Sequence, residues 1–453
     1  MFEGAEMYVK RDIEKAISSH LNSANDQFIL LSGARQTGKT SILENIRTDK
    51  EKLIINLWDE SVNTKLIKSA ATFEQLEQFL SSAYGFRPDN SKILIIDEAQ
   101  AGDHLGKFIM QMHRVWKDQR VIFSGSILSR LFRDNIPMPT GRVVEFVLRP
   151  LNFVEFLRFR NKENYLDLIP SDISEPIQKE IHDLFMSEYE LFLSIGGLPG
   201  IVQAYQNKSD HLILFESLVN NFYRDADRFL NDNGSERSST VQYGSLLEHC
   251  LKTIGRHVAF PTTNSSILST DSPAYRTILP KLLEALRSWH LVYTLEYETK
   301  QNTTKKGYSS KKYLFDTGIM NFLLTRGMPA MLKNGSEISA QLFENIICQE
   351  LVSYAGSTRA VTSFKTNNKA ESELDFVVRT GRNIIPIEVK SGEKITEKSL
   401  FQMTEFLKIN GLKKGFVVYN GTVKIKEIDD LEIVFIPPYM VNRIIDQCLM
   451  EDA

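Results

Sequence analysis

Residues 28–45 read FILLSGARQTGKTSILEN, and this stretch decides the fold of the first part of the chain. The apolar run at residues 28–32 is typical of a buried strand, and the apolar spacing after Ser41 is typical of a helix. The loop between them has glycines at positions 33 and 38, which let the backbone wrap closely around a phosphate group. A strand, a glycine-rich loop and a helix in this order predict a P-loop that binds a nucleoside triphosphate.

The loop also carries the side chains that a site for ATP and Mg²⁺ needs. Lys39 would reach the β- and γ-phosphate oxygens, and the Thr40 hydroxyl would bind the magnesium ion. A fortuitous glycine-rich turn is the alternative, and the position of the loop between a strand and a helix disfavours it. The residues expected to contact the nucleotide are Gly33, Ala34, Arg35, Gln36, Thr37, Gly38, Lys39, Thr40, Ser41 and Ser126.

A second apolar run, KILIID at residues 92–97, is followed directly by Glu98 and so ends in two acids. Ligands of open α/β sheets bind outside the carboxyl ends of the strands, which is where these acids would lie. Asp97 would hold the magnesium ion through water. Glu98 would orient or deprotonate the attacking water, which favours hydrolysis of the nucleotide over its storage.

Polar residues around the next apolar run, residues 120–125, are candidates for contacts with the γ-phosphate. Ser124, Ser126 or Gln100 would sense it, and capping of the following helix is the alternative role for a serine. Arginines further along the chain are candidates for stabilising transition-state charge, with surface salt bridges as the alternative. They are Arg130, Arg133 and, favoured among them, Arg142, which follows Gly141.

Length and composition indicate a multidomain protein of the reducing cytoplasm. A chain of 453 residues, 42% hydrophobic and 25% charged, is expected to form two to four domains. Its net charge of −3 excludes a chain that is basic overall. The cysteines at positions 250, 348 and 448 are too far apart for a metal site or a disulfide framework. No apolar run has the length of a membrane helix, and the charged N-terminus does not resemble a signal peptide.

Short, continuously apolar strands alternate with helices in the first third of the chain, which predicts a parallel sheet covered on both faces. Helices dominate the middle, and a basic-tipped hairpin follows them, as in winged-helix modules that bind nucleic acid or dock proteins. Asp316 is expected to cap the next helix. The expected segments are an α/β ATPase domain at 1–150, a helical domain at 151–235, a winged-helix-like segment at 236–325 and a smaller α/β domain at 335–453.

The tip of this hairpin, residues 299–313, contains lysines and no acid. Such a run is either a solvated loop or a source of contacts with nucleic-acid phosphates. The lysines are Lys300, Lys305, Lys306, Lys311 and Lys312.

The last α/β segment contains a second group of acids with a readable geometry. If residues 380–383 form a two-residue hairpin turn with Gly381 at positive φ, Asp375 lies directly opposite Glu388. Lys390 then shares a face with Glu388. Two carboxylates and an ammonium group suit a divalent cation near a scissile phosphate, and Glu344 on the preceding helix would add a carboxylate. Alternatively, Glu371 or Glu373 shifts this register or forms cross-strand salt bridges with Lys390.

Several motifs together resemble the prokaryotic AAA-class ATPases whose C-terminal domain is related to restriction endonucleases. They are the P-loop, the DEAQ sequence at 97–100, SGS at 124–126, GR at 141–142, PLNFVEF at 150–156, GGLP at 196–199 and FEN at 343–345. The resemblance covers nearly the whole chain and implies a winged-helix segment between two α/β domains. It also implies a restriction-endonuclease-like core in which Asp375, Glu388 and Lys390 form the motif and Glu344 is the helical acid.

These observations predict Mg²⁺-dependent ATP hydrolysis coupled to nucleic-acid binding, with DNA favoured over RNA. For the C-terminal domain, an active nuclease, a binder that does not cut and a purely structural module stay open. A nucleotide-controlled protein-interaction switch without nucleic acid is the alternative for the whole chain. No membrane partner is expected, and AAA-class sites often take an arginine from a neighbouring copy, which favours a homo-oligomer.

Overall fold

The computed structural model describes residues 8–132, 136–231, 242–256, 273–298, 310–332, 336–365, 373–392, 395 and 400–450. The chain divides into two compact units. The first comprises Met1–Arg149 with Ser288–His290, and the second comprises Pro150–Arg287 with Leu291–Ala453. Arg133, Lys300, Lys305, Lys306 and Glu371 lie outside the described residues.

The first unit is built on a five-stranded sheet in which every paired strand is parallel, as the sequence predicts. The strand order is β2-β3-β4-β1-β5. The strands are β1 (Phe28–Ser32), β2 (Glu51–Asn56), β3 (Lys92–Asp97), β4 (Val121–Gly125) and β5 (Val143–Val147). The helices are α1 (Ile13–Asn22), α2 (Lys39–Asn45), α3 (Val62–Ser69), α4 (Phe73–Tyr84) and α5 (Ile109–Val115), with 3₁₀ helices η1 (Ala99–Phe108) and η2 (Leu128–Phe132).

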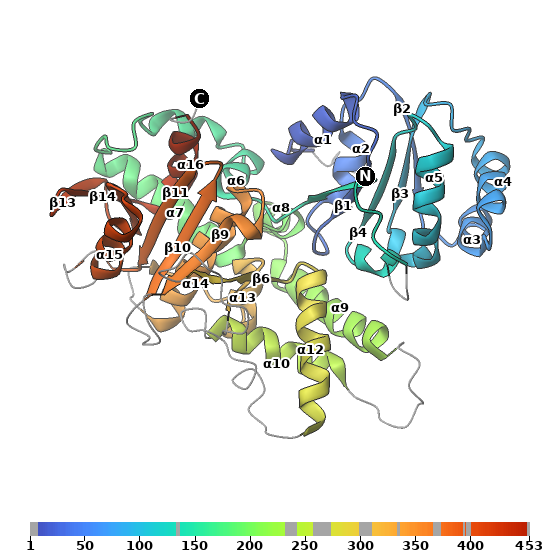
Figure 1. Ribbon diagram of the computed structural model, residues 1–453. Helices are drawn as coiled ribbons and strands as arrows, with labels where there is room; N and C mark the ends of the chain where they lie inside the picture. Colours follow the sequence, from blue (N-terminus) through green and yellow to red (C-terminus); the bar gives the residue numbers. More distant parts are fainter. Residues whose placement is uncertain are drawn as a thin grey trace. The chain divides into compact units, whose positions relative to one another are not determined.

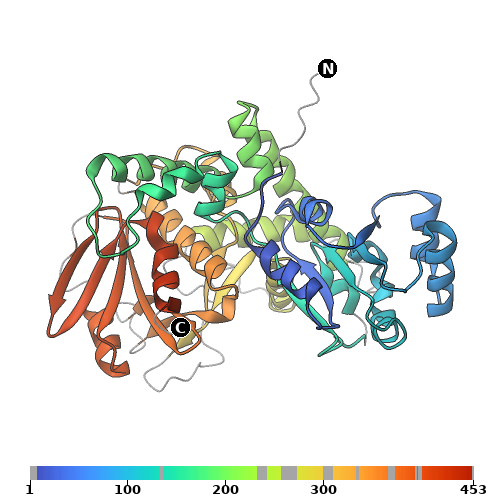
Figure 2. The ribbon, with the colours of Figure 1, turned by 90° about the horizontal axis from the view of Figure 1, so that it is seen from above.

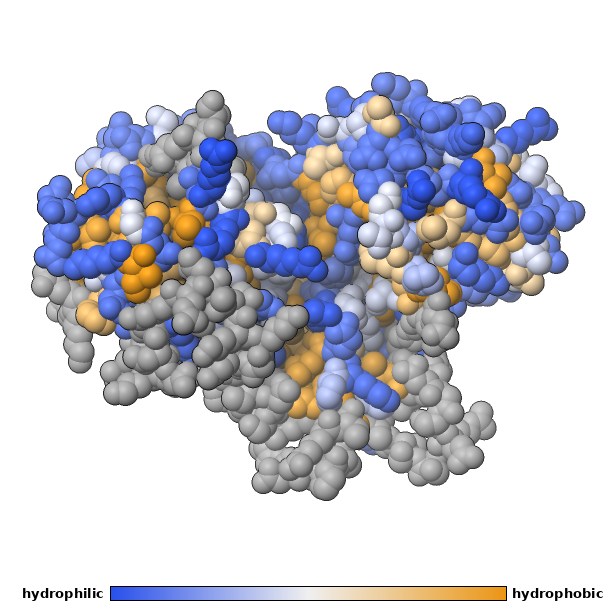
Figure 3. All heavy atoms as spheres, viewed as in Figure 1, coloured by the Kyte–Doolittle hydropathy of each residue, from blue (hydrophilic) through white to orange (hydrophobic). Residues whose placement is uncertain are grey.

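Side chains of strand β1 explain why the sheet is covered on both sides. Phe28 and Leu30 lie in one apolar cluster with residues of α3, α4 and α5, whereas Ile29 and Leu31 lie in another with residues of α1 and α2. Figure 1 shows these two groups of helices on opposite sides of the sheet. Because alternate residues of a strand point to opposite faces, a run that is apolar at every position requires both layers. The outer surface of this unit is mainly hydrophilic in the view of Figure 3.

The second unit combines helices with a seven-stranded mixed sheet of order β13-β14-β12-β11-β10-β9-β7. Helix α15 packs on one face of the sheet in an apolar cluster, and α14 and α16 lie on the side away from it (Figure 2). None of the described helices of the chain combines the length and apolarity needed to span a bilayer. The strands are β6 (Val292–Leu295), β7 (Tyr297–Glu298), β8 (Lys311–Leu314), β9 (Val361–Lys365), β10 (Glu373–Thr380), β11 (Asn383–Lys390), β12 (Lys414–Tyr419), β13 (Lys424–Ile428) and β14 (Leu431–Ile436). The helices are α6 (Phe153–Phe159), α7 (Lys179–Ile195), α8 (Pro199–Gln206), α9 (His211–Asn231), α10 (Tyr243–Arg256), α12 (Pro273–Ser288), α13 (Thr317–Thr325), α14 (Glu337–Tyr354), α15 (Phe401–Asn410) and α16 (Val441–Met450).

The expected hairpin after the middle helices forms only in part. Strands β6 and β8 pair antiparallel in a separate two-stranded sheet. Strand β7 leaves this pair and adds to the large sheet, where it runs parallel to β9. Residues expected in one hairpin arm are therefore shared between two sheets, and a winged-helix module stays a prediction.

Asp316 caps helix α13, as expected, and also holds a distant loop. Its Oδ1 accepts a hydrogen bond from the backbone N–H of Ile319 at 3.0 Å, and its Oδ2 accepts one from Gly197 at 2.7 Å. Gly196 has a φ of 71°, and a Cβ there would lie 2.2 Å from Asp316 Oδ1. Gly196 therefore both ends helix α7 and leaves room for the buried carboxylate of Asp316. Burial raises the pKa of Asp316 to about 6.

Helix α6 begins with a capping box and a buried carboxylate. Asn152 Oδ1 accepts a hydrogen bond from the N–H of Glu155 at 2.8 Å, and Glu155 Oε2 accepts one from the N–H of Asn152 at 3.2 Å. The next N–H, that of Phe153, donates to both carboxyl oxygens of Glu350 on α14, at 3.0 and 3.2 Å. Burial raises the pKa of Glu350 to about 8, although the N–H of Phe153 favours its charged form.

Candidate functional site

The P-loop joins β1 to α2 in a conformation that depends on its glycines. Gly38 has a φ of 96° directly before α2. Gly33 has a φ of 150°, and a Cβ there would lie 2.2 Å from the carbonyl oxygen of Leu148. A side chain at position 33 would therefore be both strained and in collision with backbone that follows β5.

Lys39 is buried, and its ammonium group lies over the inside of the loop. Its Nζ donates to the carbonyl oxygens of Gly33 at 2.9 Å and Ala34 at 2.8 Å. Burial lowers the pKa of Lys39 to about 8, against the opposing effect of Glu98 and Asp97. The structure thus places a buried amine at the P-loop, and its contact with the β- and γ-phosphates stays a prediction.

Thr40 and Asp97 meet at the carboxyl end of the sheet. The Thr40 hydroxyl donates to Asp97 Oδ2 at 2.8 Å. The other carboxylate oxygen, Asp97 Oδ1, is buried without a hydrogen-bond partner among the described residues. A hydroxyl and a carboxylate with an unsatisfied oxygen suit Mg²⁺, which prefers oxygen ligands and retains several waters. These two residues fit the magnesium site predicted from the sequence.

Glu98 lies directly after β3 in the left-handed helical region, with φ 51° and ψ 41°. This conformation is uncommon for residues other than glycine and often marks functional sites. The Glu98 carboxylate accepts a hydrogen bond from Gln100 Nε2, which lies 3.5 Å from the Ser126 hydroxyl. Burial raises the pKa of Glu98, and Lys39 opposes this shift. The pairing of Gln100 with both residues joins the ends of β3 and β4 into one polar group.

The two arginine candidates that the structure describes, Arg130 and Arg142, do not meet at this site. Arg130 forms an ion pair with Asp103 at 2.9 Å. Arg142 precedes β5, which is parallel to β1, and therefore lies at the amino ends of the strands, one strand length from the P-loop. It lines an open hollow of about 660 Å³ together with Arg114. Arg142 is therefore far from the nucleotide site of its own chain, because parallel strands separate their two ends, and its role in stabilising transition-state charge stays a prediction.

Arg11 supports the P-loop and was not predicted from the sequence. Its side chain is buried, and its guanidinium group donates to the carbonyl oxygens of Thr37 at 3.0 Å and Arg149 at 2.9 Å. Its backbone N–H donates to Glu14 Oε1 at 2.5 Å. The sequence offers no signal for this role, because 26 positions separate Arg11 from Thr37.

The hairpin of the second unit has the register predicted from its turn. Phe376 pairs with Ile387 and Thr380 with Asn383, and Gly381 has a φ of 60°. Asp375 Oδ2 accepts a hydrogen bond from the N–H of Val389 at 2.9 Å. A register shift of β10 against β9 between Leu374 and Val377 encloses Asp375, as bulges next to sites often do.

Lys390 and Glu388 form an ion pair on this hairpin, as the shared face predicts. Glu388 Oε2 is buried without a hydrogen-bond partner among the described residues. Burial, followed by the neighbouring Asp375, raises the pKa of Glu388 to about 8. Burial opposes the charge of Lys390, but Glu388 and Asp375 outweigh it and raise the pKa of Lys390.

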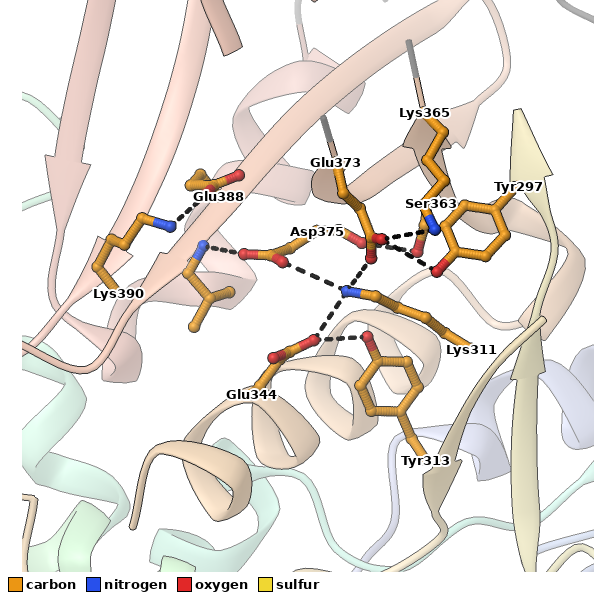
Figure 4. A network of polar contacts seen from close by, with 11 residues as sticks. Tyr297, Lys311, Tyr313, Glu344, Ser363, Lys365, Glu373, Asp375, Glu388 and Lys390 are labelled. Atoms are coloured by element: carbon orange, nitrogen blue, oxygen red, sulfur yellow. Dashed lines mark hydrogen bonds and ion pairs between the residues drawn. The ribbon is translucent and has the colours of Figure 1, made fainter. Parts of the chain in front are cut away.

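Lys311 is the residue of this site that the sequence did not reveal. Although it belongs to the run expected on the surface, it is 1% exposed, and Lys312 is buried too. Figure 4 shows its ammonium group among three carboxylates: 3.0 Å from Glu344 Oε1, 2.6 Å from Glu373 Oε1 and 3.3 Å from Asp375 Oδ1. Two of the five lysines of this run are therefore neither solvated nor available for contact with phosphates.

The predicted metal ligands Glu344, Asp375 and Glu388 do not form a metal site. Within the described ranges, no group of three or more histidine, cysteine, aspartate or glutamate side chains could hold a metal ion. Glu344 and Asp375 converge on Lys311, whereas Glu388 pairs with Lys390. The reason is electrostatic: the ammonium group of Lys311 already lies where Glu344 and Asp375 would hold a cation.

Glu373 does not form the cross-strand salt bridge with Lys390 that the sequence left open. It pairs instead with Lys311 and, at 3.2 Å, with Lys365. Burial opposes the charge of Lys311, but Glu344 and the other carboxyl groups raise its pKa well above the ordinary range. Burial also raises the pKa of Glu344. A cluster with more acids than cations therefore favours retention of a proton on one of its carboxyl groups.

Comparison with known proteins supports the assignment of the first site. Residues 25–157 match a family described as an AAA domain, and residues 339–439 match a domain of unknown function, DUF4143. The P-loop, Asp97 and Glu98 lie within the first match, which supports ATP binding and hydrolysis by this chain. The second match names no activity.

Two relatives align along most of the chain. An "Uncharacterized protein" of Haemophilus influenzae is 24% identical over 430 residues, covering 91% of this chain and 94% of that protein. An uncharacterized protein of Methanocaldococcus jannaschii is 24% identical over 450 residues, covering 95% of this chain and 90% of that protein. Both alignments therefore extend over most of this chain and over most of each relative.

Similar solved structures include the Aeropyrum pernix ORC1 protein in complex with DNA and the replication initiator DnaA bound to AMPPCP and single-stranded DNA. The first is 11% identical, with a TM-score of 0.25, and the match covers 69% of this chain and 90% of that chain. The second is 14% identical, with a TM-score of 0.26, and covers 62% and 92%. Similarity at this level assigns no function to this chain.

Proposed function

We propose that the first unit binds Mg²⁺ and ATP and hydrolyses the ATP, and that this reaction controls nucleic-acid binding by the rest of the chain. The observation that carries the ATPase proposal is the group at the carboxyl end of the parallel sheet. Lys39 lies over the P-loop, Thr40 donates to Asp97, and Glu98 follows directly. The match to an AAA domain supports the same chemistry.

Each residue of the group has a separate task in this proposal. The backbone of residues 33–41 and the Lys39 ammonium group hold the phosphates, while Thr40 and, through water, Asp97 hold the metal. Bound Mg²⁺ would neutralise the charge that develops on the phosphate oxygens. Glu98 accepts the proton of the attacking water, and burial, by raising its pKa, makes it a stronger base. Ser126 contacts the γ-phosphate side of the site.

Arg142 acts, in this proposal, in the site of a neighbouring copy of the chain. It lies at the amino ends of the strands, opposite the end that carries its own P-loop, and its side chain is exposed. An arginine that approaches the phosphates from a second copy stabilises transition-state charge without competing for space in the first. Hydrolysis would then depend on protein concentration.

Replacement of Lys39 by alanine tests the nucleotide site. We expect ATP binding to weaken by at least about 10-fold, because a charge-assisted contact with the phosphates is worth roughly 1.5–3 kcal/mol. Isothermal titration calorimetry with ATP and Mg²⁺ measures this. Lys92→Ala is the matched control, since Lys92 begins β3 at the opposite end of the sheet and pairs with Glu51. Undiminished ATP binding and turnover in Lys39→Ala would contradict the proposed site.

The nucleic-acid part of the proposal is supported by the resemblance of the chain and by Lys300, Lys305 and Lys306. We expect the double variant Lys305→Glu/Lys306→Glu to bind DNA about 10-fold more weakly and with a smaller salt dependence, since each lost phosphate contact removes about one released counterion. Fluorescence anisotropy with DNA and RNA oligonucleotides at several salt concentrations measures this. Lys65→Glu/Lys117→Glu makes the same charge change on exposed lysines of the first unit.

If neither DNA nor RNA binds, and neither changes the ATPase rate, the nucleic-acid part is wrong. A protein that co-purifies in a nucleotide-dependent manner would then favour a protein-interaction switch. DNA cleavage at Asp375, Glu388 and Lys390 is not part of the proposal, because the carboxylates there do not form a metal site.

A further inference from the structure

Four acids of the second unit, Glu344, Glu373, Asp375 and Glu388, line what we call the acidic pocket. The ammonium group of Lys311 lies where three of their carboxylates converge. Lys311 Nζ lies 2.6–3.3 Å from oxygens of Glu344, Glu373 and Asp375. Carboxylate oxygens hold a divalent metal at about 2.0–2.6 Å, so an ammonium group at these distances occupies the volume of such an ion. The same oxygens cannot surround a metal ion while Lys311 is in place, because the two positive charges would be separated by only a few ångströms.

The strand that carries Lys311 is held firmly against α14. Asn345 brackets the backbone of Leu314: its Oδ1 accepts from the Leu314 N–H at 2.8 Å, and its Nδ2 donates to the Leu314 carbonyl at 3.0 Å. Tyr313 donates to Glu344 Oε1 at 2.9 Å, and its ring lies 5.6 Å from that of Phe376. Strand β8 also pairs with β6. Lys311 is therefore a fixed part of the pocket.

Glu388 provides a second sign that the pocket would suit a cation. The residue is 5% exposed, and its Oε2 has no hydrogen-bond partner among the described residues. Asp375 lies between the Lys311 group and Glu388, since one of its oxygens faces Lys311 and the other accepts from the N–H of Val389 (Figure 4). Removal of the Lys311 charge would leave Glu344 and Asp375 without the ammonium group that they share, and would leave Glu373 with Lys365.

We infer that Lys311 is a built-in cation that replaces a divalent metal ion in the C-terminal domain, so that this domain does not cleave nucleic acid by a metal-dependent route. The pocket has the acids of a metal site, but the ammonium group of Lys311 occupies the position of the metal ion. Loss of the lysine charge opens a site for Mg²⁺ or Mn²⁺. This inference does not depend on the ATP site, which lies in the other unit.

Mn²⁺ binding to the full chain without nucleotide tests the inference. Electron paramagnetic resonance counts the bound Mn²⁺ in wild type, Asp375→Asn, Lys311→Met and Lys311→Met/Asp375→Asn. We expect wild type and Asp375→Asn to bind the same amount, and Lys311→Met to gain one site that the double variant loses. Lys312→Met is the matched control, because it removes the neighbouring lysine, whose ammonium group contacts Ser310.

Thermal unfolding gives a second readout on the same proteins. Mn²⁺ at 100 times its dissociation constant should raise the Tm of Lys311→Met by roughly 5–10 °C, and this rise should be absent from the double variant. Mn²⁺ uptake by wild type that disappears in Asp375→Asn would overturn the inference. So would a folded Lys311→Met that gains no site. If Lys311→Met does not fold without metal, Mn²⁺ binding by wild type and by Asp375→Asn still tests the inference. Refolding of Lys311→Met by Mn²⁺ would support it.

Discussion

Replacement of Glu98 by glutamine should lower ATP turnover by about 10²–10³-fold and leave ATP bound to the protein. Glutamine preserves the size of the side chain but cannot accept a proton from water, and general-base catalysis contributes roughly 10²–10⁴-fold to enzymatic rates. The contacts of Lys39 and of Thr40 with Asp97 stay in place, so nucleotide affinity should change little. Single-turnover phosphate release measures the rate, and chromatography of the denatured protein identifies the bound nucleotide.

An exposed acid of the same unit provides the control for this variant. Glu44→Gln removes the same charge from the exposed face of α2 and should turn over ATP like wild type. Because burial raises the pKa of Glu98, wild-type turnover should increase as the pH rises through that value and Glu98 loses its proton. The Glu98→Gln profile should lack this rise. Equal turnover in Glu98→Gln and wild type would exclude Glu98 as the base.

Replacement of Glu350 by glutamine should stabilise the second unit at high pH by about 3–5 kcal/mol. The folded-state pKa of Glu350 is about 8, against 4.5 for the free side chain. Its protonated form is therefore favoured by folding, so the contribution to stability is fully present below pH 4.5 and is lost as the pH rises through 8. One pKa unit corresponds to about 1.4 kcal/mol. Glutamine keeps an acceptor for the Phe153 N–H and has no proton to lose.

Urea unfolding followed by far-ultraviolet circular dichroism between pH 5 and 9 measures this effect. The wild-type midpoint should fall across this range, and the Glu350→Gln midpoint should fall less. Glu337→Gln is the control, since it changes an exposed glutamate on the first turn of the same helix and should follow wild type. Parallel curves for wild type and Glu350→Gln would show that Glu350 is charged in the folded protein and that its burial carries no such cost.

Local patterns of the sequence predicted the elements that carry both sites. The P-loop and the acids after β3 follow from apolar runs, glycines and charges that are adjacent in the chain. The register of the hairpin between β10 and β11 also follows from adjacent residues, because a short turn fixes every pair beyond it. The same reasoning could have placed Arg142 at the amino end of a strand, since the apolar run at residues 143–147 indicates a strand that begins directly after it.

The sequence by itself determined the phosphate-binding loop, the parallel sheet and the hairpin of the second unit, because each depends on residues close together in the chain. Only the tertiary structure decided which charges meet. It brought Arg11 beneath the P-loop, Glu350 to the first turn of α6, and Lys311 into a pocket of acids 33 to 64 positions away. The physical reason is that burial of a charge is tolerated only where a partner compensates it, and partners distant in sequence are selected by packing.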